Sequence, residues 1–237
     1  MKKDEVPICE IFFSYQGEGV FTGLGQIFVR FAGCNIRCKY CDTIESLRIP
    51  KKTDFINAGE IEKIILDLYK KHKKDFYSKK PFISFTGGEP LCYADFLESF
   101  LPRIKKKGFD IYLETNGTLP NQLKKIINFC DIISMDFKFP SQCGEIFWSK
   151  HKEFLKIALQ RETFIKCVIT KTVKLEEIKK AAQIVKEIAP NIFFILQPSL
   201  DKNRPELKNL YLFKKTAEKI IPNVLIMPQM HKVYRIS

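Results

Sequence analysis

Short apolar segments that alternate with helical patterns are the feature that most restricts the fold of this 237-residue chain. Seven segments read as strands, and each is nearly continuous in apolar character, which is typical of strands covered on both faces. The expected strands are Gln26–Phe31, Phe82–Phe85, Asp110–Leu113, Ile132–Met135, Phe164–Ile169, Ile192–Leu196 and Val224–Met227.

Two groups of apolar residues between these strands recur at helical spacing. They are Ile61, Ile64, Ile65 and Leu68, and then Leu175, Ile178, Ala182 and Val185. Alternation of strand and helix predicts an α/β fold with parallel strands. Periodicity alone does not separate an open doubly wound sheet from an incomplete barrel. In both folds, ligands bind at the carboxyl ends of the strands.

Composition fits a globular chain with a sizeable core, because hydrophobic residues make up 45% and charged residues 28%. No apolar run approaches the roughly 20 residues that a membrane span needs. The first residues are charged and lack the apolar segment of a signal peptide, so we expect a cytoplasmic protein without membrane contact. The net charge of +13 is compatible with an electropositive site or with nucleic-acid binding. The scattered basic residues favour a lysine-rich surface without a stable nucleic-acid partner.

Three of the eight cysteines, Cys34, Cys38 and Cys41, lie in one loop directly after an expected strand. Soft thiolates on a short loop can converge on one metal centre. Iron–sulfur clusters ordinarily use four cysteines, and here no fourth has a matching context. Three thiolates would leave one iron without a protein ligand, and an open position can bind a reactant.

Two other interpretations of the cysteine loop remain open. A zinc site could be completed by Cys9, Cys92, His72 or His151, although zinc sites more often use paired knuckles. An electron-transfer cluster could have a remote fourth cysteine. Of the remaining cysteines, Cys9, Cys130 and Cys167 are expected to be buried, and Cys92 and Cys143 have no evident partner.

Polar residues follow several of the expected strands where each strand ends. These segments are Thr86-Gly87-Gly88-Glu89-Pro90, Glu114-Thr115-Asn116-Gly117, Ser134-Met135-Asp136-Phe137-Lys138 and Gln197-Pro198-Ser199-Leu200. Because parallel strands end at one edge of a sheet, these segments would line one shared pocket. Lys138 is the least informative residue of the group, because a lysine after a strand is usually solvated.

The Cys-x3-Cys-x2-Cys spacing, with Tyr40 before the last cysteine, resembles the signature of the radical S-adenosylmethionine (SAM) superfamily. Thr86 to Pro90 are similar to its Gly-Gly-Glu-Pro motif. The resemblance implies a 4Fe-4S cluster on Cys34, Cys38 and Cys41, and SAM as the source of a 5′-deoxyadenosyl radical. It also implies that SAM contacts Tyr40, Cys41, Asp42, Gly88, Ser134, Lys138, Gln197, Pro198, Ser199 and Leu200.

Further segments narrow the resemblance to the 7-carboxy-7-deazaguanine synthases. This resemblance extends over almost the whole chain, from Glu10 to Ser237. They are Tyr15–Gly19, Phe28–Cys34, Asp42-Thr43, Glu114–Gly117 and Gln229–Lys232. That family implies a single-domain radical SAM core over residues 1–237, an incomplete (β/α)6 barrel, and a homodimer. The implied reaction converts 6-carboxy-5,6,7,8-tetrahydropterin to 7-carboxy-7-deazaguanine and releases ammonia. SAM is used catalytically, Mg2+ supports the reaction, and an external one-electron donor such as a flavodoxin reduces the cluster.

The same resemblance implies the residues that bind the pterin. They are Tyr15, Gln16, Gly17, Glu18, Arg30, Thr86, Glu114, Asn116, His231 and the terminal carboxylate of Ser237. Arg30 suits the substrate carboxylate because its charge is fixed and it can bind bidentately. A structural ion pair between Arg30 and Glu18 is the alternative. Thr43 corresponds to the Mg2+ contact, for which a hydroxyl is a suitable ligand.

One departure and two rival functions remain. Family members often end a central strand with Ser-Pro-Lys, whereas this chain has Ser134-Met135-Asp136-Phe137-Lys138, so individual SAM contacts there are open. A glycyl-radical activating enzyme has similar cluster spacing, but the Gln-Gly-Glu-Gly stretch and Arg30 argue against it. The third possibility is a non-enzymatic iron–sulfur or zinc module that binds nucleic acid, and a zinc protein without brown 4Fe-4S absorbance that binds RNA in a salt-sensitive way would favour it.

Overall fold

A computed structural model describes residues 4–49, 55–76 and 81–234 and arranges nine strands in one sheet of order β3-β1-β2-β4-β5-β6-β7-β8-β9. Seven strands that are adjacent in this order, from β2 through β4 to β9, are parallel. They are β2 (Gly25–Phe31), β4 (Phe82–Gly87), β5 (Asp110–Thr115), β6 (Ile132–Asp136), β7 (Glu162–Ile169), β8 (Phe194–Pro198) and β9 (Val224–Ile226). All seven strands expected from the sequence are therefore confirmed.

Two antiparallel strands at one edge were not expected. The strand β1 (Glu5–Tyr15) pairs with β2, and β3 (Phe55–Asn57) pairs with β1. The residues of β1 do not form a continuous apolar run, because part of this strand is exposed and a register shift falls between Ile8 and Glu10. For both reasons β1 does not show the sequence pattern of a buried parallel strand.

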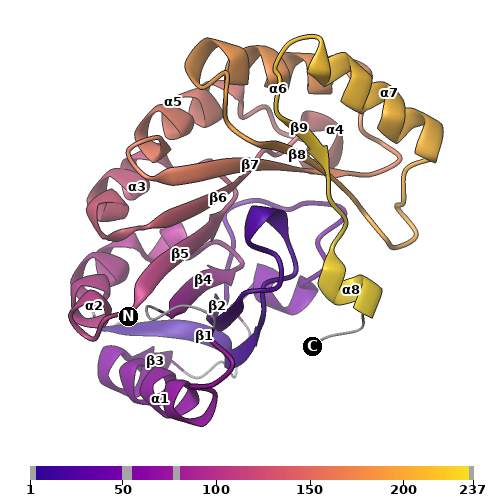
Figure 1. The fold of residues 1–237 in the computed structure, drawn as a ribbon. Helices are drawn as coiled ribbons and strands as arrows, with labels where there is room; N and C mark the ends of the chain where they lie inside the picture. The colour runs from indigo at the N-terminus through magenta and orange to yellow at the C-terminus, as the bar shows by residue number, and fades with distance from the viewer. Residues whose placement is uncertain (1–3, 50–54, 77–80, 235–237) are drawn as a thin grey trace.

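Six helices connect successive parallel strands. They are α1 (Ala58–Lys71), α2 (Ala94–Lys106), α3 (Pro120–Ile126), α5 (Trp148–Ala158), α6 (Leu175–Ile188) and α7 (Leu207–Glu218). These helices lie on the outer, convex side of a strongly curved sheet (Figure 1). The edges at β3 and β9 do not pair with each other, so the barrel is open. The expected incomplete (β/α)6 barrel is confirmed, and the doubly wound alternative is wrong because the helices cover one face.

Short helices complete the connections. They are α4 (Pro140–Cys143), α8 (Met230–Tyr234) and the 3-10 turns η1 (Gly19–Phe21), η2 (Ile44–Leu47), η3 (Pro90–Tyr93) and η4 (Ile127–Phe129). Within the described ranges, no helix is long and apolar enough to cross a membrane.

The inner face of the sheet is apolar at one end and polar at the other. Tyr112, Ile132, Phe164 and Ile195 form a small buried cluster at the amino ends of their strands. Two residues further along the same strands stand Glu114, Ser134, Lys166 and Gln197. Because residues i and i+2 of a strand share a face, these four polar residues lie next to the apolar cluster on the same inner face of the sheet. The fold thus places polar side chains at the carboxyl ends of the parallel strands.

Candidate active site

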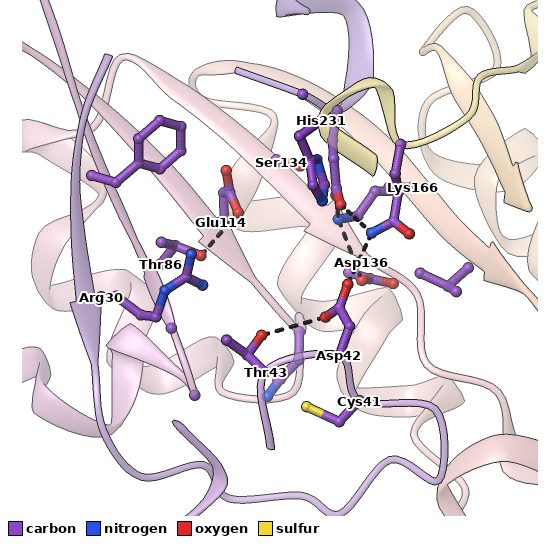
Figure 2. A pocket seen from close by; sticks show the side chains of 18 of the residues that line it. Arg30, Cys41, Asp42, Thr43, Thr86, Glu114, Ser134, Asp136, Lys166 and His231 are labelled. Carbon is purple, nitrogen blue, oxygen red and sulfur yellow. Dashed lines mark hydrogen bonds and ion pairs between the residues drawn. The ribbon is translucent and has the colours of Figure 1, made fainter. Parts of the chain in front are cut away.

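A cavity of about 720 Å³ opens at the carboxyl ends of the parallel strands, within the size range of small-molecule sites (Figure 2). Most residues expected from the sequence line it, namely Tyr15, Gln16, Gly17, Glu18, Arg30, Cys34, Cys38, Tyr40, Cys41, Asp42, Thr43, Thr86, Gly88, Glu114, Asn116, Ser134, Lys138, Gln197, Ser199 and His231. Pro198 and Leu200 are not among the described residues that line the cavity. Ser237 lies outside the described residues.

Two glycines allow the cysteine loop to lie against the glycine motif. Gly33 has φ 94°, which favours a residue without a Cβ, and its carbonyl accepts a hydrogen bond from Glu89 N at 2.9 Å. A Cβ built on Gly88 would lie 2.0 Å from the Gly33 oxygen. The backbones of the two motifs therefore meet directly, and only glycine at position 88 permits this approach.

The three loop thiols are half-buried around the cavity. Burial raises the pKa of Cys34 to about 11. Among the described residues, no three His, Cys, Asp or Glu side chains converge closely enough to hold a single ion. Thiols spread around a wider cavity fit a four-iron cluster better than one zinc ion, because a cluster separates its ligands.

Two of the other cysteines differ from the expectation. Cys143 has a partner after all, because its sulfur lies 3.5 Å from that of Cys38. The hydrogen bond from the Cys143 thiol lowers the pKa of Cys38 to about 7. Cys9 is exposed rather than buried, because it lies on an exposed part of β1, whereas Cys130 and Cys167 are buried as expected.

Glu89 joins the loops that follow β4 and β5. Its buried carboxylate accepts hydrogen bonds from Leu91 N at 3.1 Å, Thr115 Oγ1 at 2.8 Å and Asn116 N at 2.8 Å. Burial raises the pKa of Glu89 to about 7. The side chain of Asn116 donates to Asn35 Oδ1 at 2.9 Å, which places Asn116 beside the cysteine loop.

Buried polar atoms without partners mark the side of the cavity near β6 and β8. Gln197 is 1% exposed, and neither end of its amide has a partner among the described residues. Asp136 Oδ1 is likewise buried and unpaired within the described ranges. Such groups normally have a partner, so they are suited to hydrogen bonds with a ligand.

Lys138 is not solvated. Its side chain is 12% exposed, and its Nζ donates to Asp136 Oδ2 at 2.8 Å and to Tyr40 Oη at 3.0 Å. The lysine turns inward because two polar partners next to the cysteine loop receive its ammonium group.

Arg30 and Glu114 form the opposite side of the cavity, where Figure 2 shows their side chains near Thr86. Arg30 Nε donates to Glu10 Oε1 at 2.7 Å, and its guanidinium lies over the Phe12 ring at 5.6 Å. Glu114 accepts hydrogen bonds from Gln16 Nε2 and Thr86 Oγ1, both at 2.9 Å.

The expected alternative of an ion pair between Arg30 and Glu18 is wrong, because Glu18 pairs with Lys166. Lys166 is one of the lining residues that the sequence did not single out. Although burial opposes ionisation of Glu18, the Lys166 ammonium lowers the pKa of this carboxyl to about 2. A charged residue inside the otherwise apolar segment Phe164–Ile169 was the available signal.

The C-terminal segment closes one side of the cavity over the cysteine loop. Gln229 Nε2 donates to Glu18 Oε1 at 2.7 Å and to Asp42 Oδ2 at 3.0 Å. Lys232 Nζ lies 2.6 Å from the same Asp42 oxygen. The ring of His231 packs on Gly17, where a Cβ would lie 2.3 Å from Nδ1. Gln229 and Lys232 belong to a segment noted in the sequence, but their partners come from distant loops.

The lining residues fit the two groups that the sequence implies. Three thiols of one loop line the cavity, and that loop approaches the glycine motif backbone to backbone. The unpaired amide of Gln197 and the unpaired oxygen of Asp136 offer hydrogen bonds to a polar cofactor such as SAM.

Comparisons with known proteins agree with this geometry. The model of the Radical SAM superfamily matches residues 28–185. The 7-carboxy-7-deazaguanine synthase of Geobacter sulfurreducens is 37% identical over 98% of each chain, and that of Archaeoglobus fulgidus is 35% identical over 95% of this chain and 96% of its own. The crystal structure of QueE from Escherichia coli superposes with a TM-score of 0.62 at 22% identity, covering 96% of this chain and 95% of the other, which supports the fold. The chain belongs to the 7-carboxy-7-deazaguanine synthase family of radical SAM enzymes, whose members act in 7-deazapurine biosynthesis.

Proposed function

We propose that this enzyme converts 6-carboxy-5,6,7,8-tetrahydropterin to 7-carboxy-7-deazaguanine and ammonia, with a 4Fe-4S cluster held by Cys34, Cys38 and Cys41. The observation that carries the proposal is one cavity lined both by the three-thiol loop and by the Arg30 and Glu114 side chains. With the cluster and SAM bound, cleavage of the sulfonium supplies a radical that abstracts hydrogen from the substrate. The protein residues bind and orient the two molecules.

Arg30 and Glu114 offer complementary charges to the two ends of a carboxylated pterin. The Arg30 guanidinium, held by Glu10, would bind the substrate carboxylate. The Glu114 carboxylate, fixed by Gln16 and Thr86, would accept hydrogen bonds from the amino group and ring N–H of the pterin.

The remaining proposed substrate contacts come from the end of β1 and the loop after it, from the loop after β5 and from the C-terminal segment. They are Tyr15, Gly17, Glu18, Asn116, His231 and Ser237. Glu18 and His231 are already ordered by Lys166 and by Gly17, so they would contact substrate with little loss of side-chain freedom.

SAM would lie between the cysteine loop and the ends of β6 and β8. Tyr40, Asp42, Gly88, Ser134, Lys138, Gln197 and Ser199 are the proposed contacts that line the cavity there. For Pro198 and Leu200 we propose only a supporting role, because neither lines the cavity.

Thr43 is the proposed Mg2+ contact. Its Oγ1 lies 3.3 Å from Asp42 Oδ1, so a hydroxyl and a carboxylate stand together at the cavity wall. Mg2+ prefers oxygen ligands and keeps several waters, and a site with few protein ligands suits it.

We also propose that residues 1–237 form one domain and that the enzyme acts as a homodimer in the cytoplasm. An external one-electron donor such as a flavodoxin would reduce the cluster. The net charge of +13 supports association with an acidic carrier.

Anaerobic turnover tests the proposed reaction. Reconstituted, reduced enzyme should convert the carboxylated pterin to the deazaguanine and release one ammonia for each pterin, without net loss of SAM. Arg30→Lys should raise the KM for the pterin at least tenfold, because an ammonium cannot bind a carboxylate bidentately. Arg103→Lys is the matched control, since Arg103 pairs with Glu62 outside the cavity. An unchanged pterin beside continued release of 5′-deoxyadenosine would overturn the substrate assignment.

A further inference from the structure

The contact between Cys38 and Cys143 brings together two loops that are distant in sequence. Cys38 belongs to the loop after β2, and Cys143 ends the short helix α4 after β6. Their sulfur atoms lie 3.5 Å apart. Cys143 has no role in the proposed reaction, although it is a fourth thiol beside one of the three proposed cluster ligands.

Both sides of this contact are held by hydrogen bonds of the surrounding backbone and side chains. Lys39 N donates to Gln142 O at 3.1 Å, which fixes the residue after Cys38 to the residue before Cys143. The buried Gln142 side chain donates to Val168 O at 2.9 Å, which ties α4 to β7. Ser141 donates to Glu177 on α6 through its backbone N at 2.8 Å and its hydroxyl at 2.7 Å. The two thiols therefore meet because their backbones are fixed, not because two flexible loops happen to touch.

The two sulfurs are already close to bonding distance, at 3.5 Å. A disulfide needs a sulfur separation of about 2.05 Å, so the two sulfur atoms must move closer than their present 3.5 Å. Cys38 and Cys143 are both half-buried, which leaves them within reach of a small-molecule oxidant.

We propose that Cys38 and Cys143 form a reversible disulfide in the cluster-free enzyme, with a small-molecule disulfide such as oxidised glutathione as the oxidant. Attack by one cysteine on the oxidant gives a mixed disulfide and one reduced thiol. Attack by the second cysteine then forms the Cys38–Cys143 bond and releases the second thiol. The two cysteines together lose two electrons and two protons, which the oxidant takes up as two thiols.

This inference rests on the proposed function in one respect, the assignment of Cys38 as a cluster ligand. The disulfide would occupy that ligand, so an oxidised chain could not assemble the cluster until a thiol reductant reopened the bond. It would also shield Cys38 from oxidation to sulfinic or sulfonic acid, which is irreversible.

The sequence permits an unambiguous mapping experiment. Trypsin cleaves after Arg37, Lys39 and Lys138, so Cys34, Cys38, Cys41 and Cys143 fall in four different peptides. Reduced, cluster-free protein would be treated with oxidised glutathione, alkylated, digested and analysed by mass spectrometry. We expect the main linked pair to be the Cys38 and Cys143 peptides, with two hydrogens fewer than their sum. A main link between Cys38 and Cys41, or only glutathione adducts on Cys38 and Cys143, would overturn the proposal.

Cys143→Ser and Cys92→Ser form a matched pair of variants. After oxidation, wild type and Cys92→Ser should take up no iron until dithiothreitol is added. The Cys143→Ser chain should lose the link, and when reduced before reconstitution it should assemble the cluster like wild type. If wild type binds iron equally well with and without dithiothreitol after oxidation, the disulfide does not block assembly and the proposal fails.

Alkylation of the reconstituted protein separates this proposal from the cluster assignment. Cys38 should resist iodoacetamide when the cluster is bound, and it should react in reduced, cluster-free protein. If Cys38 reacts in brown, reconstituted protein, the ligand assignment is wrong, whereas a Cys38–Cys143 link in cluster-free protein would still establish the disulfide.

Discussion

Replacing Lys166 by methionine should destabilise the fold more than any other single change to the charged network of the cavity. Lys166 and Glu18 are a buried pair, with side chains 10% and 16% exposed. Lys166→Met keeps the apolar stem but leaves the Glu18 carboxylate with the Gln229 amide at 2.7 Å and no adjacent ammonium. Removing one partner of a buried ion pair costs about 3–5 kcal/mol, because the other charge stays buried and uncompensated.

Glu18→Gln should cost less, because it leaves Lys166 with a second carboxylate. Asp136 Oδ2 lies 3.7 Å from Lys166 Nζ, so a charge partner remains. We expect a loss of about 1–3 kcal/mol, the range for one disrupted buried hydrogen bond. The double variant Lys166→Met/Glu18→Gln should lose less than the sum of the single changes, since no unpaired carboxylate is then left on Glu18.

Urea unfolding of the reduced, cluster-free proteins at pH 7 measures these free energies. Lys179→Met is the matched control, because Lys179 and Glu176 form an exposed pair with side chains 41% and 77% accessible. That change should alter the free energy of unfolding by less than about 0.5 kcal/mol. A loss below about 1 kcal/mol for Lys166→Met, or additive losses in the double variant, would mean that Lys166→Met leaves no buried, uncompensated charge on Glu18.

Three further predictions concern pH, packing and metal dependence. Burial lowers the pKa of His151 from 6.5 to about 3, so its contribution to stability is present above pH 6.5 and lost as the pH falls towards 3. At pH 5 the free energy of unfolding, measured with urea, should be lower by about 2 kcal/mol. His151→Phe should remove that part of the pH dependence. An unchanged dependence of the free energy of unfolding on pH in this variant would contradict the prediction. Gly88→Ala should prevent cluster uptake, measured as brown absorbance, because its Cβ would meet the Gly33 oxygen at 2.0 Å, whereas Gly59→Ala in α1 should reconstitute normally. Thr43→Val should lower the stimulation of turnover by Mg2+ and Thr43→Ser should restore it, and equal stimulation in both variants would argue against the contact.

Much of the fold could be predicted because its parallel strands are buried on both faces. The segment Ile132–Asp136 is buried throughout, and such runs are visible in the sequence. The strand β1 was missed because only part of it is buried and its register shifts near Ile8. The same exposure explains why Cys9 was wrongly expected in the core.

The candidate site was predicted where its residues are close in sequence. Cys34, Cys38 and Cys41 share a loop, so their spacing indicates a common metal centre. Lys166 was missed because its partner Glu18 comes from a different part of the chain. Cys143 was missed for the same reason, since the distance to Cys38 depends on how the loops after β2 and β6 meet. Local patterns carry no information on such pairings.

We propose that three thiols of this cavity hold a cluster whose fourth iron binds SAM. Pulsed electron paramagnetic resonance of the reduced, reconstituted enzyme, with 15N in the methionyl amino group of SAM, tests it most directly. We expect a nitrogen hyperfine coupling in wild type, unchanged in Cys143→Ser and absent when Cys34, Cys38 or Cys41 is replaced. If the wild-type spectrum lacks the coupling and the Cys143→Ser spectrum shows it, Cys143 is a fourth ligand of the cluster. In that case no iron of the wild-type cluster is free to bind SAM.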